Sequence, residues 1–237
     1  MFAPTMTPYE AVHADPDGDA TVARLALTAS EYGYDGLVVR NHGDALTDSD
    51  ADRISEEYGI DVVDGVEIRA ADPARASGFV GNHRDHRTIV AVHGGSVEMN
   101  RFAVEQPAVD VLAHPMVDDG DFNHVLAKAA AKNNVHVELS LARVLRSDGG
   151  ERVQALRDLR KLRELLGDAD APFVVSADPR SHLQLRAPRE LRALGEVLGF
   201  DPDVVETGLA AWGELAERNR ERASDAFVEP GVWIDEE

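Results

Sequence analysis

The chain has 237 residues, of which 43% are hydrophobic, and its formal net charge at pH 7 is −20. That length and apolar content suffice for a sizeable core, in one α/β barrel or in two small domains. It contains no cysteine, which excludes disulfides, thiolate catalysis and cysteine-based zinc sites. No apolar run reaches the length of a membrane span, and the N-terminus lacks the basic-then-apolar order of a signal peptide. We therefore expect a soluble cytoplasmic protein with no membrane partner.

The charge has an unusual composition. Only three residues are lysines, at positions 128, 132 and 161, against 21 arginines and 44 acids spread along the chain. A densely acidic surface of this kind is typical of proteins adapted to molar intracellular salt, where charge is screened beyond roughly 3 Å at 1 M. Net charge then says little about partners, and an acidic chain of this type can still bind nucleic acid. The simpler interpretation, an acidic protein that avoids polyanions, stays open.

The predicted elements alternate between short apolar strands and helices. A weak first strand at residues 9–14 precedes an aspartate-rich turn and a helix over 20–33. Residues 73–86 are less regular, and we expect a loop with a short helix there. Further strands are predicted at 35–41, 60–69, 88–93, 109–113, 135–141 and 173–175, and further helices at 48–58, 96–105, 121–133, 150–166, 188–199 and 203–223.

Strict alternation of strands and helices implies parallel strands joined by right-handed crossovers. About seven strands fit either a (β/α) TIM-like barrel, seven-stranded or distorted and surrounded by helices, or an open doubly wound sheet. No glycine-rich phosphate loop follows an early strand, which disfavours the dinucleotide-binding sheet. We therefore predict the barrel. No linker or shift in composition divides the chain, so we expect a single domain over residues 1–237 with a short C-terminal tail from about residue 224.

Polar side chains gather where the predicted strands end. In a (β/α) barrel, the loops after the strands build the functional face. The residues at these ends are His13, Arg40, Asn41, His42, Glu67, Arg69, His93, His114, Glu138, Ser140, Ser176, Asp178, Arg180 and His182. This is a dense set of imidazoles, carboxylates and guanidinium groups.

One interpretation is a metal-dependent hydrolase, because imidazole and carboxylate groups are natural ligands of divalent cations. A metal-bound water would then attack an ester or phosphoester. Metal barrels usually present paired ligands such as His-x-His on the first strand, however, and here only His13 occupies that strand end. Arg40 and Arg69 stand where ligands would be most useful, and a guanidinium repels a metal ion. These features speak against an intact metal site.

The other interpretation is an anion-binding face without metal. Arginines at strand ends suit bidentate contacts with phosphate. For any single arginine, pairing with a nearby acid is the more ordinary role. His114 before Pro115 fits a backbone hydrogen bond equally well, and we expect Glu67 to be the partner of Arg40 or Arg69 rather than a metal ligand.

The segment from residue 174 to residue 200 carries a resemblance. It reads VVSAD, then LRAPREL, and then a helix that ends in LGF. This order resembles the C-terminal signature of the archaeal ribonuclease P protein component 3 family, in its haloarchaeal form. Other landmarks agree in order: EYGYDG at 31–36, Asn41-His42, GVEI at 65–68 and LAHP at 112–115. The resemblance covers about residues 9–200.

The resemblance implies a barrel like that of the polymerase-and-histidinol-phosphatase superfamily with its metal site lost. It further implies a subunit of ribonuclease P, the enzyme that removes 5′ leaders from precursor tRNA. In that enzyme the RNA supplies the chemistry with Mg²⁺. The subunit itself would have no catalytic residue, metal or cofactor of its own, and whether it counts as an enzyme is left open. Its partners would be the ribonuclease P RNA, other protein subunits and, indirectly, precursor tRNA.

The predicted RNA contacts follow from position at the strand ends and from the family's arginine-rich box. They are Arg40, Arg69, His114, Arg180, Arg186 and Arg189. Two alternatives to this function stay open: a metal-dependent phosphoesterase of the same superfamily, and an interaction scaffold that binds no RNA.

Overall fold

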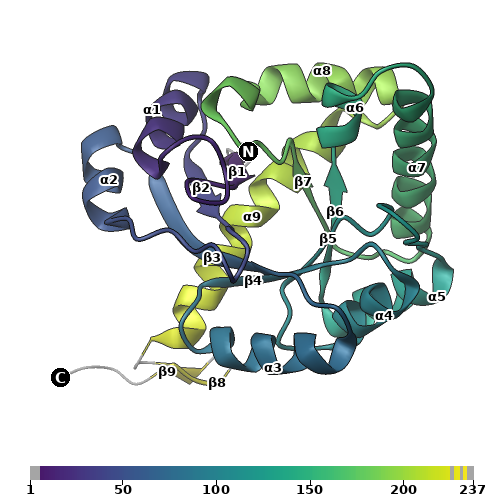
Figure 1. Cartoon of the computed structure of the whole chain (residues 1–237), viewed down its shortest axis with the longest axis horizontal. Helices are drawn as coiled ribbons and strands as arrows, with labels where there is room; N and C mark the ends of the chain where they lie inside the picture. The colour runs from purple at the N-terminus through teal and green to yellow at the C-terminus, as the bar shows by residue number, and fades with distance from the viewer. Residues whose placement is uncertain (1–5, 225–226, 230–231, 234–237) are drawn as a thin grey trace.

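The computed structural model describes residues 6–224, 227–229 and 232–233. Seven parallel strands pair in chain order, and helices surround them in a nearly closed barrel (Figure 1). The strands are β1 (Tyr9–Val12), β2 (Gly36–Val39), β3 (Asp61–Ile68), β4 (Ile89–His93), β5 (Val111–Ala113), β6 (His136–Ser140) and β7 (Phe173–Ser176). The predicted seven-stranded (β/α) barrel is thus confirmed.

The helices follow the predicted alternation, with some shifted starts. They are α1 (Val22–Tyr32), α2 (Ala51–Tyr58), α3 (Pro73–Arg84), α4 (Val97–Glu105), α5 (His124–Asn133), α6 (Ala142–Arg146), α7 (Gly149–Asp168), α8 (Pro188–Leu198) and α9 (Pro202–Ala223), with a short 3₁₀ turn η1 at His182–Gln184. Side-chain caps fix several starts: the side chains of Thr21, Asp50, Ser96 and Asn123 accept hydrogen bonds from backbone N–H groups of the first turn. The first helix therefore begins two residues later than predicted.

Residues 73–84 form a full helix instead of the predicted loop with a short helix. Asp72 caps it by accepting from the backbone N–H of Arg75, and Pro73 occupies the first turn, where a missing N–H costs nothing. Only Ala76 and Val80 of this helix are buried, so it lacks a broad apolar stripe. The caps define this helix more clearly than its hydrophobic pattern does.

The seam between the first and last strands is closed by a side chain. No regular ladder joins β1 and β7, although the backbone N–H of His13 donates to the carbonyl of Pro179 at 3.1 Å. The buried carboxyl of Glu10 bridges the seam instead, accepting from the Ser176 hydroxyl at 2.7 Å and from the Ala177 N–H at 3.1 Å. The Tyr34 hydroxyl lies 3.2 Å from its other oxygen. Glu10 thus substitutes for missing strand-to-strand hydrogen bonds.

The last long helix packs against that seam. Helix α9 crosses the middle of the view beside β7 and β1 (Figure 1). Trp212 of α9 is fully buried among apolar residues of the barrel interior, and its indole N–H donates to the Val175 carbonyl at 2.9 Å. A Cβ on Gly208 would collide with Val175, and one on Gly213 would collide with the Tyr9 ring. These two glycines allow the helix to lie directly on the strands.

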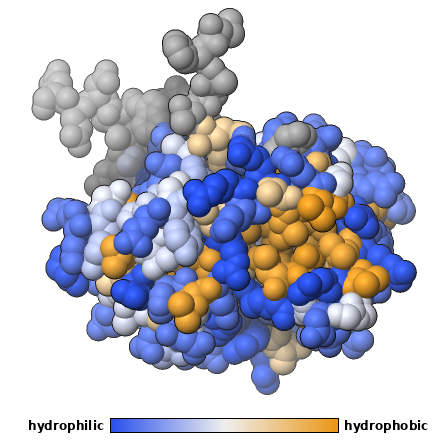
Figure 2. All heavy atoms as spheres, turned by 90° about the horizontal axis from the view of Figure 1, so that it is seen from above, coloured by the Kyte–Doolittle hydropathy of each residue, from blue (hydrophilic) through white to orange (hydrophobic). Residues whose placement is uncertain are grey.

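The face of the molecule shown in Figure 2 is mostly hydrophilic, but it also carries an apolar area. On the face seen from above Figure 1, where α8 lies, apolar residues gather in the right half of the view (Figure 2). Among the described residues, every helix is too short or too polar to cross a membrane. The predicted tail from residue 224 lies partly outside the described residues; within it, β8 (Phe227–Glu229) pairs antiparallel with β9 (Val232–Trp233).

The seam gives the first prediction. Burial raises the pKa of Glu10 from 4.5 to about 7, even though its hydrogen bonds from Ser176 and Ala177 lower it. The folded state therefore holds a proton on Glu10 that the unfolded chain releases, and the free energy of unfolding falls as pH rises from 4.5 to 7. Glu10→Gln keeps an acceptor toward Ala177 and removes this titration. Measured by chemical denaturation, the variant should gain about 3 kcal/mol relative to the parent chain between pH 4.5 and pH 8.

Glu10→Ala serves as the control, because it should be less stable than Glu10→Gln at every pH. A stability difference between Glu10→Gln and the parent chain that does not change with pH would contradict this account of the seam.

Candidate functional site

The carboxyl ends of the strands converge on a buried group of charged side chains. We call this group the polar centre. Its members come from the carboxyl ends of all seven strands and, for Asp17, from the loop after β1. They are His13, Asp17, Arg40, His42, Glu67, His93, His114, Glu138 and Asp178. The polar centre contains most of the predicted strand-end residues.

Arg40 lies at the middle of the polar centre and is completely buried. Its Nη2 atom is 2.5 Å from Glu138 Oε1 and 3.2 Å from Asp178 Oδ1, and its Nη1 atom is 3.1 Å from Glu67 Oε2. The guanidinium also lies over the Trp212 ring, 5.5 Å from its centroid. Burial alone would lower the pKa of Arg40, but the three carboxylates raise it above its ordinary value, so the side chain is a permanent cation.

Glu67 is the carboxylate that most members of the polar centre share. Besides Arg40, it pairs with His93 Nδ1 at 2.5 Å and lies 3.7 Å from His114 Nε2. Burial would raise its pKa, yet Arg40 and His114 hold the pKa of Glu67 well below its ordinary value. The expectation that Glu67 pairs with an arginine is therefore confirmed for Arg40.

Asp17 organises the other side of the polar centre. Its Oδ2 atom lies 2.7 Å from His13 Nδ1 and 2.8 Å from His42 Nδ1, and it accepts from the His42 backbone N–H at 2.9 Å. These contacts hold the pKa of Asp17 below its ordinary value against the effect of burial. Burial lowers the pKa of His13, but its bonds to Asp17 and Asp178 outweigh this and raise the pKa to about 9. His13 is thus a second cation at neutral pH.

The imidazoles form a row along this end of the barrel. Ring centroids are 5.0 Å apart for His13 and His42, 5.9 Å for His42 and His93, and 4.9 Å for His93 and His114. His114 has a left-handed backbone, with φ at 51°, and its N–H donates to Glu138 Oε2 at 3.2 Å. Its ring faces the carboxylates as well, with Nε2 3.7 Å from Glu67 and Nδ1 3.6 Å from Glu138, so His114 does more than end the strand.

This arrangement suits a metal ion poorly. Two ligand groups within the described residues lie close enough to be considered, His13–Asp17–His42 and His42–Glu67–His93. Ligand atoms bound to one ion at about 2.1 Å lie roughly 3 Å or more apart, yet each group contains an imidazole–carboxylate pair in hydrogen-bond contact, at 2.7 and 2.5 Å. The Arg40 guanidinium already pairs with Glu67, Glu138 and Asp178. The side chains present therefore fit a resident divalent ion less well than they fit this arginine.

The six predicted RNA contacts occupy different environments. The burial of Arg40 is not compatible with the predicted contact, because no guanidinium atom reaches the surface, and the His114 side chain is only 11% exposed. The Arg69 side chain is 56% exposed and lies 3.9 Å from an Asp44 carboxylate oxygen. Arg40 is therefore a structural cation of the polar centre, while Arg69 remains available at the rim.

The remaining three predicted contacts lie near η1 and α8. Arg180 is partly exposed and pairs with Asp17 Oδ1 at 2.7 Å. Arg186 is also partly exposed and donates to the carbonyl groups of Leu183 and Leu185, whereas Arg189 is exposed in the first turn of α8. These residues are accessible to a partner, and their contact with RNA stays a prediction.

Two carboxylates were not among the predicted site residues. Asp17 lies in the aspartate-rich loop after the first strand and Glu10 inside that strand, and their sequence positions resemble an ordinary turn and a surface charge. One signal for Asp17 is its spacing of four residues from His13, which allows a loop carboxylate to return to the strand end. Glu10 offers no comparable signal, since its partners Ser176 and Ala177 lie more than 160 residues away.

Comparisons with known proteins agree on one family. The sequence model described as RNase P subunit p30 matches residues 8–224. The ribonuclease P protein component 3 of Haloarcula marismortui is 64% identical over 97% of both chains. A chain in the cryo-EM structure of archaeal ribonuclease P with mature tRNA superposes with a TM-score of 0.82 at 26% identity, covering 97% of this chain and 98% of that one.

A more distant likeness concerns the fold alone. Histidinol phosphate phosphatase from Lactococcus lactis, solved with zinc, L-histidinol and phosphate, has a TM-score of 0.56 at 10% identity and covers 82% of this chain and 95% of its own. The barrel is thus shared with a metal-containing phosphatase.

The polar centre predicts a strong dependence of stability on Arg40. Arg40→Leu would leave Glu67, Glu138 and Asp178 buried without their cation, which should cost about 3–5 kcal/mol in the free energy of unfolding. Arg40→Lys keeps the charge but loses the planar fork, so its loss should be smaller. Denaturation in molar KCl should rank the parent chain first, then Arg40→Lys, then Arg40→Leu.

Glu138→Gln provides the matched control, because it removes one buried charge that Arg40 neutralises. Combined with Arg40→Leu, it should recover part of the lost stability. An Arg40→Leu variant as stable as the parent chain would show that the buried carboxylates do not need this cation.

Proposed function

Because the chain belongs to the RNase P subunit p30 family, we propose that it is a protein subunit of ribonuclease P. In this role it binds the RNA of that enzyme and another protein subunit, and it assists the RNA in removing 5′ leaders from precursor tRNA. The family match over residues 8–224 and the high identity to a ribonuclease P protein component 3 support the subunit role. The superposition with a chain of archaeal ribonuclease P covers nearly the full length of both proteins.

The position of Arg40 is the observation that supports a subunit without catalytic activity of its own. A hydrolase of this barrel type would need an open, cation-binding end with a reachable water. Here the guanidinium of Arg40 fills the middle of that end and is not exposed to solvent. We therefore propose that the chain has no cofactor or catalytic residue of its own and that the Mg²⁺ used in the reaction belongs to the RNA.

We propose that the exposed arginines at this end of the barrel contact RNA. Arg69 follows β3 and Arg180 pairs with Asp17 of the polar centre, whereas Arg186 lies between η1 and α8 and Arg189 in the first turn of α8. A guanidinium can bind phosphate through two parallel hydrogen bonds, which matters where salt screens longer-range attraction.

Two further features of the proposed function concern its surroundings. We assign the contact with another protein subunit to the apolar area on the face where α8 lies (Figure 2), because burial of such an area on association is favourable.

We also propose that the chain works in the cytoplasm, where precursor tRNA is available in cells without a nucleus.

Reconstitution in molar KCl tests the subunit role. The catalytic RNA and the other protein subunits are mixed with or without this chain, and cleavage of the 5′ leader is measured. The rate should rise when the chain is added, and the RNA should copurify with it from its native cells. Unchanged cleavage together with a chain free of RNA would refute the proposal.

The rim arginines give a separate prediction. Arg69→Glu and Arg189→Glu should each weaken binding of the chain to ribonuclease P RNA by about tenfold, because a phosphate contact is replaced by repulsion. Melting temperatures should change little, since both side chains are exposed. Arg157→Glu on the outer face of α7 is the matched control and should bind RNA as the parent chain does. Equal binding of RNA by all three variants would show that Arg69 and Arg189 do not contact RNA.

A further inference from the structure

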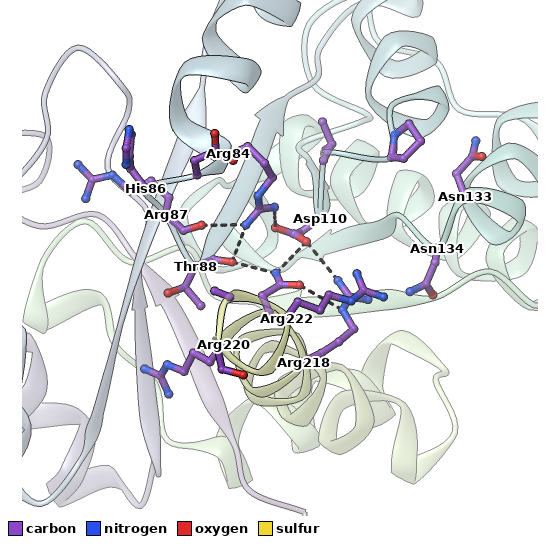
Figure 3. A pocket seen from close by; sticks show the side chains of 16 residues that line it. Arg84, His86, Arg87, Thr88, Asp110, Asn133, Asn134, Arg218, Arg220 and Arg222 are labelled. Atoms are coloured by element: carbon purple, nitrogen blue, oxygen red, sulfur yellow. Dashed lines mark hydrogen bonds and ion pairs between the residues drawn. The ribbon is translucent and has the colours of Figure 1, made fainter. Parts of the chain in front are cut away.

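A large groove lies at the end of the barrel opposite to the polar centre. It has a volume of about 860 Å³ and is bordered by the segments that lead into β4, β5 and β6 and by the last turns of α9. Figure 3 shows guanidinium groups from two sides of this groove around Asp110. The polar centre, by contrast, lies at the carboxyl ends of the strands, so the two sites are separated by the barrel.

The lining of this groove reverses the charge balance of the protein. Among the residues that the structure describes, five arginines line it, against two acids. The arginines are Arg84, Arg87, Arg218, Arg220 and Arg222, and the acids are Asp85 and Asp110. In a chain with a formal charge of −20, such a concentration of guanidinium groups on one wall requires an explanation.

Neighbouring acids neutralise only part of this charge. Arg87 pairs with Asp64, and Arg220 pairs with Asp61, so these two arginines add little net charge. Asp110, however, is shared: Arg84 lies 2.6 Å from one of its oxygens and Arg218 lies 3.1 Å from the other. One carboxylate thus faces two guanidinium groups.

Arg84 is held rigidly at the groove. Besides Asp110, its guanidinium donates to the carbonyl groups of Arg87 and Thr88 at 2.8 and 2.9 Å. Asn219 donates to the same Thr88 carbonyl and to Asp110. The end of α9 is therefore fastened to the entrance of β4 and β5, and the charges keep fixed positions.

Two arginines of α9, Arg218 and Arg222, repel each other. Arg218 and Arg222 are four residues apart, which places two like charges on one helix face and is unfavourable in an isolated helix. Burial lowers the pKa of Arg218, and Arg222 and Arg84 lower it further, while Asp110 raises it. Favourable interaction with the helix dipole accounts for basic residues in a last turn, but not for Arg84 facing them from another element.

We propose that this groove is an RNA-binding site in which Arg222 and Arg218 contact backbone phosphates. The inference rests on the proposed function and adds a second RNA contact to the rim arginines, on the opposite end of the barrel. An anion between Arg222, Arg218 and Arg84 relieves the repulsion that Asp110 only partly offsets.

The lining favours RNA over an acidic protein segment. The buried centre of a protein interface is usually rich in aromatic and other apolar side chains. Among the described residues of the lining, Pro107, Val109 and Ala223 are apolar, and the others are charged or polar. Guanidinium and amide donors without an apolar anchor suit phosphate and ribose oxygens.

Arg222→Glu tests the groove, because Arg222 is exposed and pairs with no acid among the described residues. The full-length variant is compared with the parent chain, with Arg222→Lys and with the control Arg157→Glu. Binding to ribonuclease P RNA and leader cleavage by the reconstituted enzyme are measured in molar KCl. Arg222→Glu should lose at least about fivefold in RNA affinity, Arg222→Lys less, and Arg157→Glu nothing.

Crosslinking provides a second measurement that does not depend on the folding of a variant. After ultraviolet irradiation of the parent chain with ribonuclease P RNA, peptides from residues 84–88 and 218–224 should carry nucleotide adducts. Absence of these adducts, or an Arg222→Glu variant with the RNA affinity of the parent chain, overturns the groove proposal. The proposed function still stands in that case if the parent chain stimulates cleavage. Loss of binding to a protein subunit with unchanged RNA affinity also overturns it, in favour of a protein contact. A parent chain that neither binds RNA nor stimulates cleavage refutes both proposals.

Discussion

The guanidinium of Arg40 joins carboxylates that come from three different parts of the barrel. Glu67 belongs to β3, Glu138 to β6 and Asp178 to the loop after β7, and all three lie within 3.2 Å of the arginine, which itself follows β2. Burying so many charges is costly unless each is paired. The cation therefore determines how the strand ends meet, and the histidines arrange around the remaining carboxylate oxygens. A barrel end that resembles a catalytic site in composition becomes a neutralised structural core.

This arrangement leaves the middle of the barrel unsuited to binding other molecules. The polar centre is almost closed to solvent, so contacts with other molecules fall to exposed residues. Exposed arginines lie around the polar centre, an apolar area lies on the face of α8, and a basic groove lies at the opposite end. Helix α9 links these parts, because Trp212 supports Arg40 from within the barrel while Arg218 and Arg222 line the groove. The chain is thus suited to act as a scaffold with several contact surfaces.

Much of this fold could be predicted from the sequence, and particular residues show why the rest could not. Short apolar runs ending in polar residues predicted the strands and the polar strand ends. Side chains alternate between the two faces of a strand, so Arg40 points to the same side as Val38, which lies in the barrel interior. The sequence alone does not show which face of the strand is the interior one. Only a short helix within a loop was predicted where α3 lies, because the apolar residues of this segment form no broad stripe. Asp17 and Glu10 escaped prediction because their roles depend on contacts made across the closed barrel.

The central claim is that the buried carboxylates are paired with the Arg40 guanidinium and not with a divalent ion, and calorimetric titration of the purified chain tests it most directly. Mn²⁺ and Zn²⁺ are titrated separately into the chain in molar KCl after dialysis against a chelator, with metal content measured before and after. The account predicts no stoichiometric binding of either ion and no rise in melting temperature on their addition. One tightly bound ion per chain, lost when His42 or His93 is replaced by alanine, would contradict it.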